Sequence, residues 1–425
     1  MQATRIMSEL KNDLVPAQQT DTSALRNYVG DGQDILLQGF HWDSHRGATE
    51  CTRRRTWYQI IRDNARRIKE AGFTCVWFPP CSDSLAPQGY LPRRWYAFDT
   101  AYGGEGDLRA AIGGLHPVKA LADVIVNHRV GVATAGADFE DPAFPNNRAA
   151  VTCDDNSGVG SGNRDTGEAV PAGRDLDHTN PDVRTAIKDY LNRLREIGFR
   201  GWRYDLVKGF YGGFIAEYND ATAPYFSVGE FFDGDRQKVT DWIDRTGGKS
   251  AAFDFPTRFE LLEACTTDDY ARLRSADGGR AIPAGLIGYW PSRSVTFLDN
   301  HDTETRREAE NRQCNNGIRH FPGKRVAMGY AYILTHPGIP CVFWPHYFDW
   351  DQYTPERIDR LIHIRKTAGI HSSSSIAIYE ACRGLYAAII GGRLAVKLGP
   401  QEWSPRGDGW QLAVHGEKFA VWNRC

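Results

Sequence analysis

The sequence of 425 residues lacks a long apolar run, an excess of charge of one sign and a secretory leader. No segment approaches the roughly 18 consecutive apolar residues of a membrane-spanning helix, so we predict no membrane association. Lys and Arg number 51 against 53 Asp and Glu, which leaves no basic surplus for binding nucleic acid. Residues 1–34 lack the apolar core of a signal peptide, although a mature chain whose leader had been removed would look the same. With 41% hydrophobic and 24% charged residues, the chain has the composition of an ordinary globular protein.

The cysteines also lack the spacing of a known framework. There are nine, an odd number, and neither a CxxC pair nor a close Cys/His cluster occurs. This pattern excludes a typical zinc site and gives no sign of a disulfide framework. Cys75 and Cys341 lie inside apolar stretches and are predicted to be small core residues.

Short apolar stretches alternate with segments of helical periodicity along most of the chain. The apolar stretches are nearly continuous, as is typical of strands covered on both faces. Eight strands, each followed by a helix, predict an α/β fold of the (β/α)₈ TIM-barrel type. A doubly wound open sheet is the alternative, and it is weakened because no Gly-rich phosphate loop follows the first strand. The expected strands lie at 35–40, 73–80, 121–128, 199–207, 225–232, 251–256, 294–300 and 341–348.

Two segments fall outside this alternation and set the expected domain boundaries. Residues 129–175 are rich in Gly, Asp and Asn, and so long a loop after the third strand is usually functional. Residues 370–425 alternate apolar and polar positions, which predicts a small antiparallel β domain. The barrel is then expected at 31–128 and 176–369, after an N-terminal tail at 1–30.

Polar side chains recur near the carboxyl ends of the expected strands. Arg203 and Asp205 stand two positions apart on the fourth strand and therefore point to the same face. Glu230 follows the fifth strand, and His301 and Asp302 follow the seventh. A single such residue is more often a cap or one half of a structural salt bridge. Their recurrence at one end of a barrel, where the active sites of this fold lie, predicts a catalytic mouth.

Three carboxylates at one mouth suit the cleavage of a glycosidic bond. One can attack the sugar carbon, one can protonate the leaving oxygen, and the positive charge that develops needs negative neighbours. Arg203 beside Asp205 is expected to keep that carboxylate ionised. A carboxyl group near other carboxylates has a raised pKa, which suits a general acid at neutral pH.

Four stretches resemble, in order, the four motifs of the α-amylase family of glycoside hydrolases (family 13). They are DVIVNH, GWRYDLVKG, GEFF and FLDNHD, at 123–128, 201–209, 229–232 and 297–302. The stretches ILLQGFHWD, GYLPRRWY, GYAYILTHPGIPC and HGEKFAVWN are most similar to plant-type α-amylases and their bacterial relatives, among them maltooligosaccharide-forming amylases. The resemblance covers nearly the whole chain.

The resemblance implies a monomer that hydrolyses internal α-1,4 bonds of starch, glycogen or maltooligosaccharides with retention of configuration. A maltooligosaccharide-forming exo-amylase or a related transglycosylase is an alternative. A non-catalytic glucan-binding protein on the same barrel is less favoured, because such relatives usually lose carboxylates that this chain keeps.

The family's catalytic roles carry over residue by residue. Asp205 would be the nucleophile, Glu230 the general acid and base, and Asp302 the stabiliser of the transition state. Arg203 would orient Asp205.

The resemblance also implies the residues that hold the sugar. His128 and His301 would hydrogen-bond the distorted ring, and Tyr90 would stack under it. Lys208 would contact the leaving-group side. Phe232 stands two residues after the acid, where plant-type members have Trp, so the platform on that side is expected to differ.

A single structural calcium ion is a further implication of the resemblance. Oxygen-rich loops are what Ca²⁺ prefers. The side chains of Asn127, Asp165 and Asp175 and the backbone carbonyls of Glu168 and Gly209 match the family's ligands. Such an ion would clamp the 129–175 insertion to the barrel.

Aromatic residues away from the mouth suggest a second glucan contact. Tyr289 and Trp290 are adjacent just before the seventh strand, where plant-type relatives have a surface platform for starch. Tyr386 stands where relatives have a tyrosine that grips a sugar chain. Packing of Trp290 and Tyr386 in the core is the competing interpretation.

Overall fold

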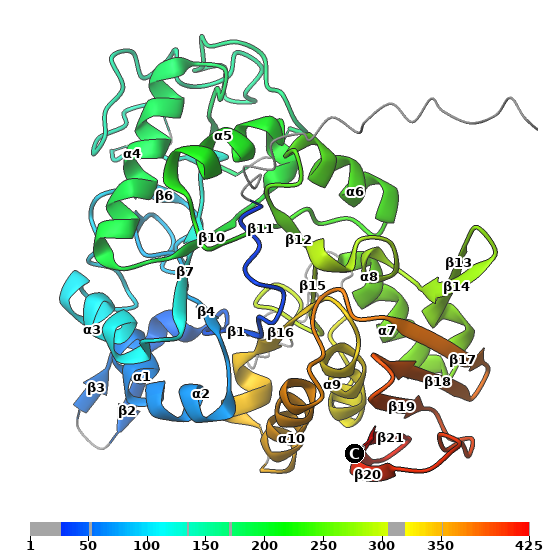
Figure 1. Ribbon diagram of the computed structural model, residues 1–425. Coiled ribbons are helices and arrows are strands. Elements are labelled where there is room, and N and C mark those ends of the chain that lie inside the picture. Colours follow the sequence, from blue (N-terminus) through cyan, green and yellow to red (C-terminus); the bar gives the residue numbers. More distant parts are fainter. Residues whose placement is uncertain are drawn as a thin grey trace, which may run out of the picture.

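Eight parallel strands close into a barrel at the centre of the molecule (Figure 1). The computed structural model describes residues 27–50, 53–133, 136–169, 172–304, 319–350 and 352–424. Leu36 of the first strand pairs with Cys75 on one side and Cys341 on the other, which closes the ring. The barrel strands are β1 (Leu36–Gln38), β4 (Cys75–Trp77), β7 (Lys119–Val124), β10 (Gly201–Tyr204), β11 (Phe226–Gly229), β12 (Ala251–Phe253), β15 (Ser294–Thr296) and β16 (Ile339–Phe343).

Helices surround the barrel because each strand is followed by an amphipathic or apolar segment. Thr56 and Gln59 form a capping box that starts the first helix, and Asn180 caps the fourth, which has Pro181 in its first turn. Asn64 interrupts the first expected helix, so two short helices follow β1. The helices are α1 (Trp57–Asp63), α2 (Ala65–Ala71), α3 (Glu105–Leu115), α4 (Pro181–Ile197), α5 (Gly213–Thr222), α6 (Arg236–Arg245), α7 (Phe255–Thr267), α8 (Leu286–Tyr289), α9 (Val326–Thr335) and α10 (Tyr353–Thr367).

The segment between β7 and α4 forms a loop-rich insertion that begins and ends in a short two-stranded sheet. Its strands are β8 (His128–Arg129) and β9 (Arg174–Asp175). The buried Arg129 guanidinium donates to the carbonyls of Pro142 and Glu140 and lies over the ring of Trp95 at 4.6 Å. The cation–π contact fastens the insertion to the loop after β4, and the carbonyl bonds hold the backbone of the insertion around the guanidinium.

Short elements complete the loops. The hairpin strands are β2 (Ala48–Glu50) with β3 (Arg53–Arg55), β5 (Asp83–Ser84) with β6 (Pro92–Arg94), and β13 (Arg274–Asp277) with β14 (Arg280–Pro283). Single turns are η1 (Ser44–Arg46), η2 (Val207–Gly209), η3 (Tyr270–Leu273), η4 (Pro291–Arg293), η7 (Gly323–Arg325) and the π-helical η8 (Pro345–Asp349).

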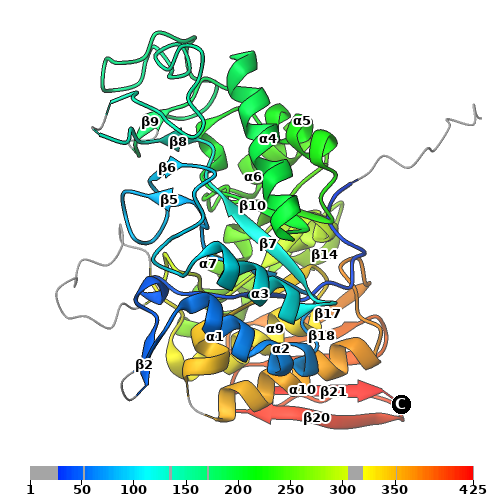
Figure 2. The ribbon, with the colours of Figure 1, turned by 90° about the vertical axis from the view of Figure 1, so that its left-hand side faces the viewer.

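A five-stranded antiparallel sheet follows α10 and packs against α9. Its strands, in spatial order, are β17 (Ile376–Cys382), β18 (Leu385–Ile390), β19 (Leu394–Leu398), β21 (Phe419–Arg424) and β20 (Trp410–Gly416). Figure 2 shows the insertion at one end of the molecule and this sheet at the other. The predicted TIM barrel with a C-terminal β domain is therefore confirmed.

The barrel interior and the layer beneath the helices form the hydrophobic core. The strand residues are almost fully buried, which explains their continuous apolar pattern. Cys75 and Cys341 are buried there, as predicted, and the six cysteines in the described part of the chain are free. None of the described helices is both long and apolar enough to cross a membrane.

Candidate active site

Arg203 is the centre of a cluster of three carboxylates at the carboxyl end of the barrel. Its Nη1 lies 2.8 Å from Asp123 Oδ1 and 2.6 Å from Asp205 Oδ1, and its Nη2 lies 2.9 Å from Glu230 Oε2. The arginine side chain is only 1% exposed, so these ion pairs are shielded from water. One buried cation thus holds three acids from three strands together.

The register of neighbouring strands produces this cluster. Arg203 on β10 pairs with Asp123 on β7 and with Val228 on β11. Because side chains two residues apart on a strand share a face, Asp205 and Glu230 follow Arg203 and Val228 on the interior side. The structure therefore explains why a buried strand carries an arginine and an aspartate that point the same way.

His301 and Asp302 reach the site from a turn after β15. The Asn300 side-chain oxygen accepts hydrogen bonds from the backbone N–H groups of Asp302 and Thr303, both at 3.0 Å. Asp302 Oδ2 lies 3.2 Å from Nε2 of His301. Its side chain is 34% exposed, against 7% for Glu230, so Asp302 lies on the solvent side of the acid cluster.

Burial and like charges raise the pKa of one of these acids, Glu230. Burial raises the pKa of Glu230 well above its ordinary value, Arg203 opposes this rise, and Asp205 and Asp302 reinforce it. Leu206 N–H donates to Glu230 Oε2 at 3.2 Å. The raised pKa of Glu230 suits a carboxyl group that carries a proton.

Asp123 is a site residue that the motif comparison left without a role. Its Oδ2 accepts hydrogen bonds from Trp77 Nε1 at 3.1 Å and from the Tyr90 hydroxyl at 2.9 Å. The pKa of Asp123 is raised to about 7, because burial raises it by more than the neighbouring Arg203 lowers it. Since its partners all donate, they favour the ionised form. Its place as the first residue of the DVIVNH motif was the signal in the sequence.

Aromatic rings form one wall of the site. Tyr90 stacks on His301 with 5.1 Å between centroids and 4° between planes. Trp42, which the motifs did not single out, lies parallel to both rings at 6.2 Å. His128 Nε2–H donates to the Tyr90 carbonyl at 2.8 Å, which fixes the loop that carries this tyrosine. A flat aromatic wall of this kind suits the apolar faces of sugar rings.

The residues predicted for the leaving-group side lie together beyond Glu230. Lys208 Nζ pairs with Asp233 at 2.8 Å and lies 5.1 Å from the centroid of the Phe231 ring. Phe232 is partly buried and packs on Phe255 of α7 at 4.2 Å. Asp233, directly after the GEFF motif, is a further residue that sequence comparison did not assign.

The predicted calcium ligands converge where the insertion meets the barrel. Asn127 Oδ1, Asp165 Oδ2 and Asp175 Oδ1 are buried and have no hydrogen-bond partner in the described structure. A Cβ on Gly209 would lie 1.9 Å from Asn127 Oδ1, so only glycine lets that backbone approach. The Glu168 N–H donates to the Lys208 carbonyl at 2.9 Å, which brings the fifth predicted ligand alongside.

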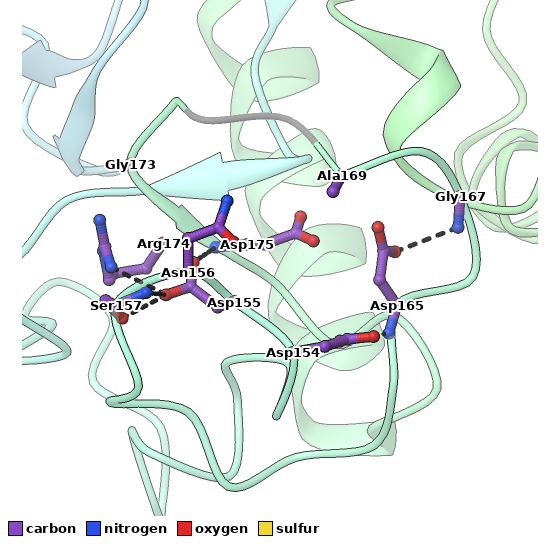
Figure 3. A pocket seen from close by; sticks show the side chains of 10 residues that line it. All are labelled: Asp154, Asp155, Asn156, Ser157, Asp165, Gly167, Ala169, Gly173, Arg174 and Asp175. Atoms are coloured by element: carbon purple, nitrogen blue, oxygen red, sulfur yellow. Dashed lines mark hydrogen bonds and ion pairs between the residues drawn. The ribbon is translucent and has the colours of Figure 1, made fainter.

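Figure 3 shows two of these carboxylates in a pocket of the insertion with a volume of about 330 Å³. Asp165 and Asp175 face each other there, and burial together with Asp165 raises the pKa of Asp175 to about 9. Asp155 in the same pocket is neutralised by Arg174 at 2.8 Å. No group of three or more His, Cys, Asp or Glu suited to a metal occurs among the described residues. The donor set here is instead an amide, two carboxylates and carbonyls, which fits the oxygen preference of Ca²⁺.

The residues predicted as a surface glucan contact lie in different environments. The Tyr289 side chain is 51% exposed beneath Arg236, and Trp290 is partly buried beside Arg293. Tyr386 is fully buried. Its hydroxyl donates to His336 Nε2 at 2.8 Å. The expectation that Tyr386 contacts a sugar chain is therefore wrong, because a buried ring has no face to offer a sugar.

Comparison with known proteins agrees with this geometry. A family model described as the α-amylase C-terminal β-sheet domain matches residues 367–423. The chain is 38% identical to probable α-amylase 2 of Arabidopsis thaliana, over 95% of this chain and 97% of that protein. It is 35% identical to the chloroplastic α-amylase 3 of the same plant over 93% of this chain, but that alignment spans 44% of the longer protein.

More distant relatives share the fold. The chain is 31% identical to glucan 1,4-α-maltotetraohydrolase of Stutzerimonas stutzeri, over 87% of this chain and 68% of that protein. The structure of an α-amylase from Malbranchea cinnamomea superposes with a TM-score of 0.64 at 19% identity, covering 87% of this chain and 85% of that one. A full-length relative at 38% identity shows that the chain belongs to the α-amylase family of glycoside hydrolases, three of whose motifs supply the groups paired around Arg203.

Proposed function

We propose that the protein hydrolyses internal α-1,4-glucosidic bonds of starch, glycogen and maltooligosaccharides with retention of configuration. The observation that carries this proposal is the binding of Asp205 and Glu230 by one buried guanidinium. A nucleophile and an acid so close to one another suit double displacement, in which the two carboxyl groups are about 5–5.5 Å apart. The names of the relatives, α-amylase and maltotetraohydrolase, agree with this substrate class.

In this mechanism each acid has a separate task. Asp205, paired with Arg203, attacks the anomeric carbon, and Glu230 gives its proton to the leaving oxygen. Glu230 then takes a proton from water, which cleaves the glycosyl-enzyme. Asp302 stabilises the positive charge that develops on the sugar ring. Tyr90 and His301 form the wall against which the ring lies.

The anomeric configuration of the first product tests the mechanism. NMR of a fresh maltoheptaose digest is expected to show the α-anomer first, followed by mutarotation. Glu230→Gln serves as the inactive control. An initial β-anomer would contradict double displacement.

A maltooligosaccharide-forming exo-amylase is the second candidate, because two relatives with about a third of their residues identical are maltotetraohydrolases. Chromatography of early products on soluble starch separates the two. A ladder of many lengths indicates endo-cleavage, whereas a single dominant oligosaccharide indicates exo-action. A maltooligosaccharide whose non-reducing end is blocked provides a second check, since endo-cleavage still degrades it whereas exo-action from that end does not.

We further propose that one Ca²⁺ ion is held by Asn127, Asp165 and Asp175 with the carbonyls of Glu168 and Gly209. The three unpaired buried oxygens support this assignment. When bound, the ion supplies positive charge between two acids that otherwise repel each other. It would join the insertion to the segment after β7 and to η2, next to the mouth of the barrel but not on the three catalytic acids.

A surface contact for glucan is proposed at Tyr289 and Trp290 only. The exposed Tyr289 ring supports it, and the partly buried Trp290 provides an adjacent aromatic face.

The protein is further proposed to act as a monomer.

A further inference from the structure

His301 lies in an aromatic box with little room to change its orientation. Phe40 and Tyr90 lie 5.1 Å from its ring centroid, Trp77 lies at 5.6 Å edge-on, and Trp42 lies at 6.2 Å. The side chain is 1% exposed. Packing therefore fixes the plane of the imidazole but does not by itself decide which nitrogen carries the proton.

Two of the polar contacts of His301 bear on its protonation. Gln38, the last residue of β1, is 1% exposed, and its Nε2 lies 3.0 Å from His301 Nδ1. An amide NH₂ can only donate, so Nδ1 must accept and cannot carry a proton. On the other side of the ring, Nε2 lies 3.2 Å from Oδ2 of Asp302. A carboxylate accepts, so Nε2 carries the proton and donates.

We propose that Gln38 is a positioning residue that holds His301 as the neutral Nε2–H tautomer and, through it, fixes the Asp302 carboxylate. The role of Gln38 in catalysis rests on the proposed hydrolysis, but the tautomer of His301 can be observed without turnover. The chain of donors runs in one direction, from the Gln38 amide to His301 and from His301 to Asp302.

The position of Gln38 explains why this residue can act on a distant turn. Asp302 lies after β15, in a turn held by Asn300, whereas Gln38 ends β1. β16 lies between these two strands in the barrel, so the hydrogen bond spans a full strand. The rigid barrel strand thereby orients a carboxylate carried on a loop, which is how precise sites are usually supported.

The first experiment observes the ring nitrogens of His301 directly. In protein labelled with ¹⁵N in the histidine rings, the signals of His301 are assigned by their absence from His301→Asn. We expect one protonated and one unprotonated nitrogen at about pH 7, with the long-range coupling pattern of the Nε2–H tautomer. Two protonated nitrogens, or a proton on Nδ1, would overturn the proposal even if the enzyme proved inactive on glucans.

The second experiment uses variants of Gln38. Gln38→Met keeps the size but removes the donor, and a mixture of tautomers is expected. Gln38→Glu offers a carboxylate to Nδ1, which should protonate both nitrogens. For each variant, kcat on a long maltooligosaccharide should fall about tenfold to a hundredfold with KM little changed, because remote subsites still bind the chain.

The control is Gln33→Glu, the same chemical change at an exposed position before the opposite end of β1. It should leave the His301 signals and kcat unchanged. If Gln38→Met folds with an unchanged melting temperature, spectrum and kcat, Gln38 does not position His301. If the variant fails to fold, the tautomer of the wild-type protein still decides the proposal.

Discussion

Arg203 shows how one residue can determine the chemistry of a site. Its guanidinium contacts three carboxylates through two different nitrogens. Only a planar fork of donors can reach several acids in this manner, and an ammonium group acts as a single point charge.

Arg203→Lys is therefore expected to fold but to lose about 10² to 10³ in kcat, because the nucleophile and the acid are no longer held in register. Stopped assays on soluble starch measure the loss, and circular dichroism checks the fold. Arg66→Lys, at an exposed position on α2, is the matched control. Activity of Arg203→Lys within a factor of about three of wild type would contradict the role assigned to the guanidinium.

The pH dependence of activity is also set by single residues. The raised pKa of Glu230 keeps its proton at higher pH than an ordinary glutamate, so activity should decline as the pH rises through that pKa. Asp302 is one cause of the raised value. In Asp302→Asn this like charge is absent, so the alkaline limb of kcat/KM should move to lower pH.

The residual activity of Asp302→Asn can be followed on maltoheptaose at high enzyme concentration, because its sugar leaving group still needs the proton of Glu230. Asp241→Asn, an exposed acid on α6, should leave the alkaline limb in place. A limb that stays or moves upward in Asp302→Asn would show that another group controls it.

At the level of elements, the junction between the insertion and the barrel carries the main prediction. Asp165 and Asp175 repel each other when both are ionised, and Ca²⁺ would remove this repulsion. Metal that binds only the folded state stabilises it by about 2.7 kcal/mol at a concentration of one hundred times Kd.

Addition of Ca²⁺ to metal-free protein is thus expected to raise the melting temperature, and Asp175→Asn should weaken this response. Calorimetry at fixed ionic strength, with Mg²⁺ as the comparison ion, measures it. Asp154→Asn is the control, since its carboxylate lines the same pocket without belonging to the proposed ligands. An equal rise in melting temperature in Asp175→Asn and Asp154→Asn would show that the ion binds elsewhere.

At the scale of the whole molecule, the question is whether a long glucan touches the surface away from the mouth. Trp290→Ala is expected to weaken binding to starch granules several-fold while turnover of a short soluble oligosaccharide stays unchanged. Tyr386→Phe should leave granule binding unaltered, because that ring is buried. Equal loss on both substrates in Trp290→Ala, or a large drop in melting temperature, would mean that the ring only packs.

The barrel, its C-terminal sheet and the strands that carry the acidic cluster could be predicted from the sequence alone. Continuous apolar strands alternating with helices leave few other arrangements, and polar residues at one end of such strands must share a mouth. Local pattern was sufficient here because the fold repeats the same unit eight times.

The contacts between different strands and loops could not be predicted from the sequence and are visible only in the folded protein. Asp123 became a partner of Arg203 through the register of β7 and β10, and Gln38 reached His301 from another strand. Burial likewise removed Tyr386 from the surface. Such contacts depend on the closure of the barrel and on packing between segments that are distant in the sequence. The local sequence pattern of either segment does not encode how close the two lie in the folded protein.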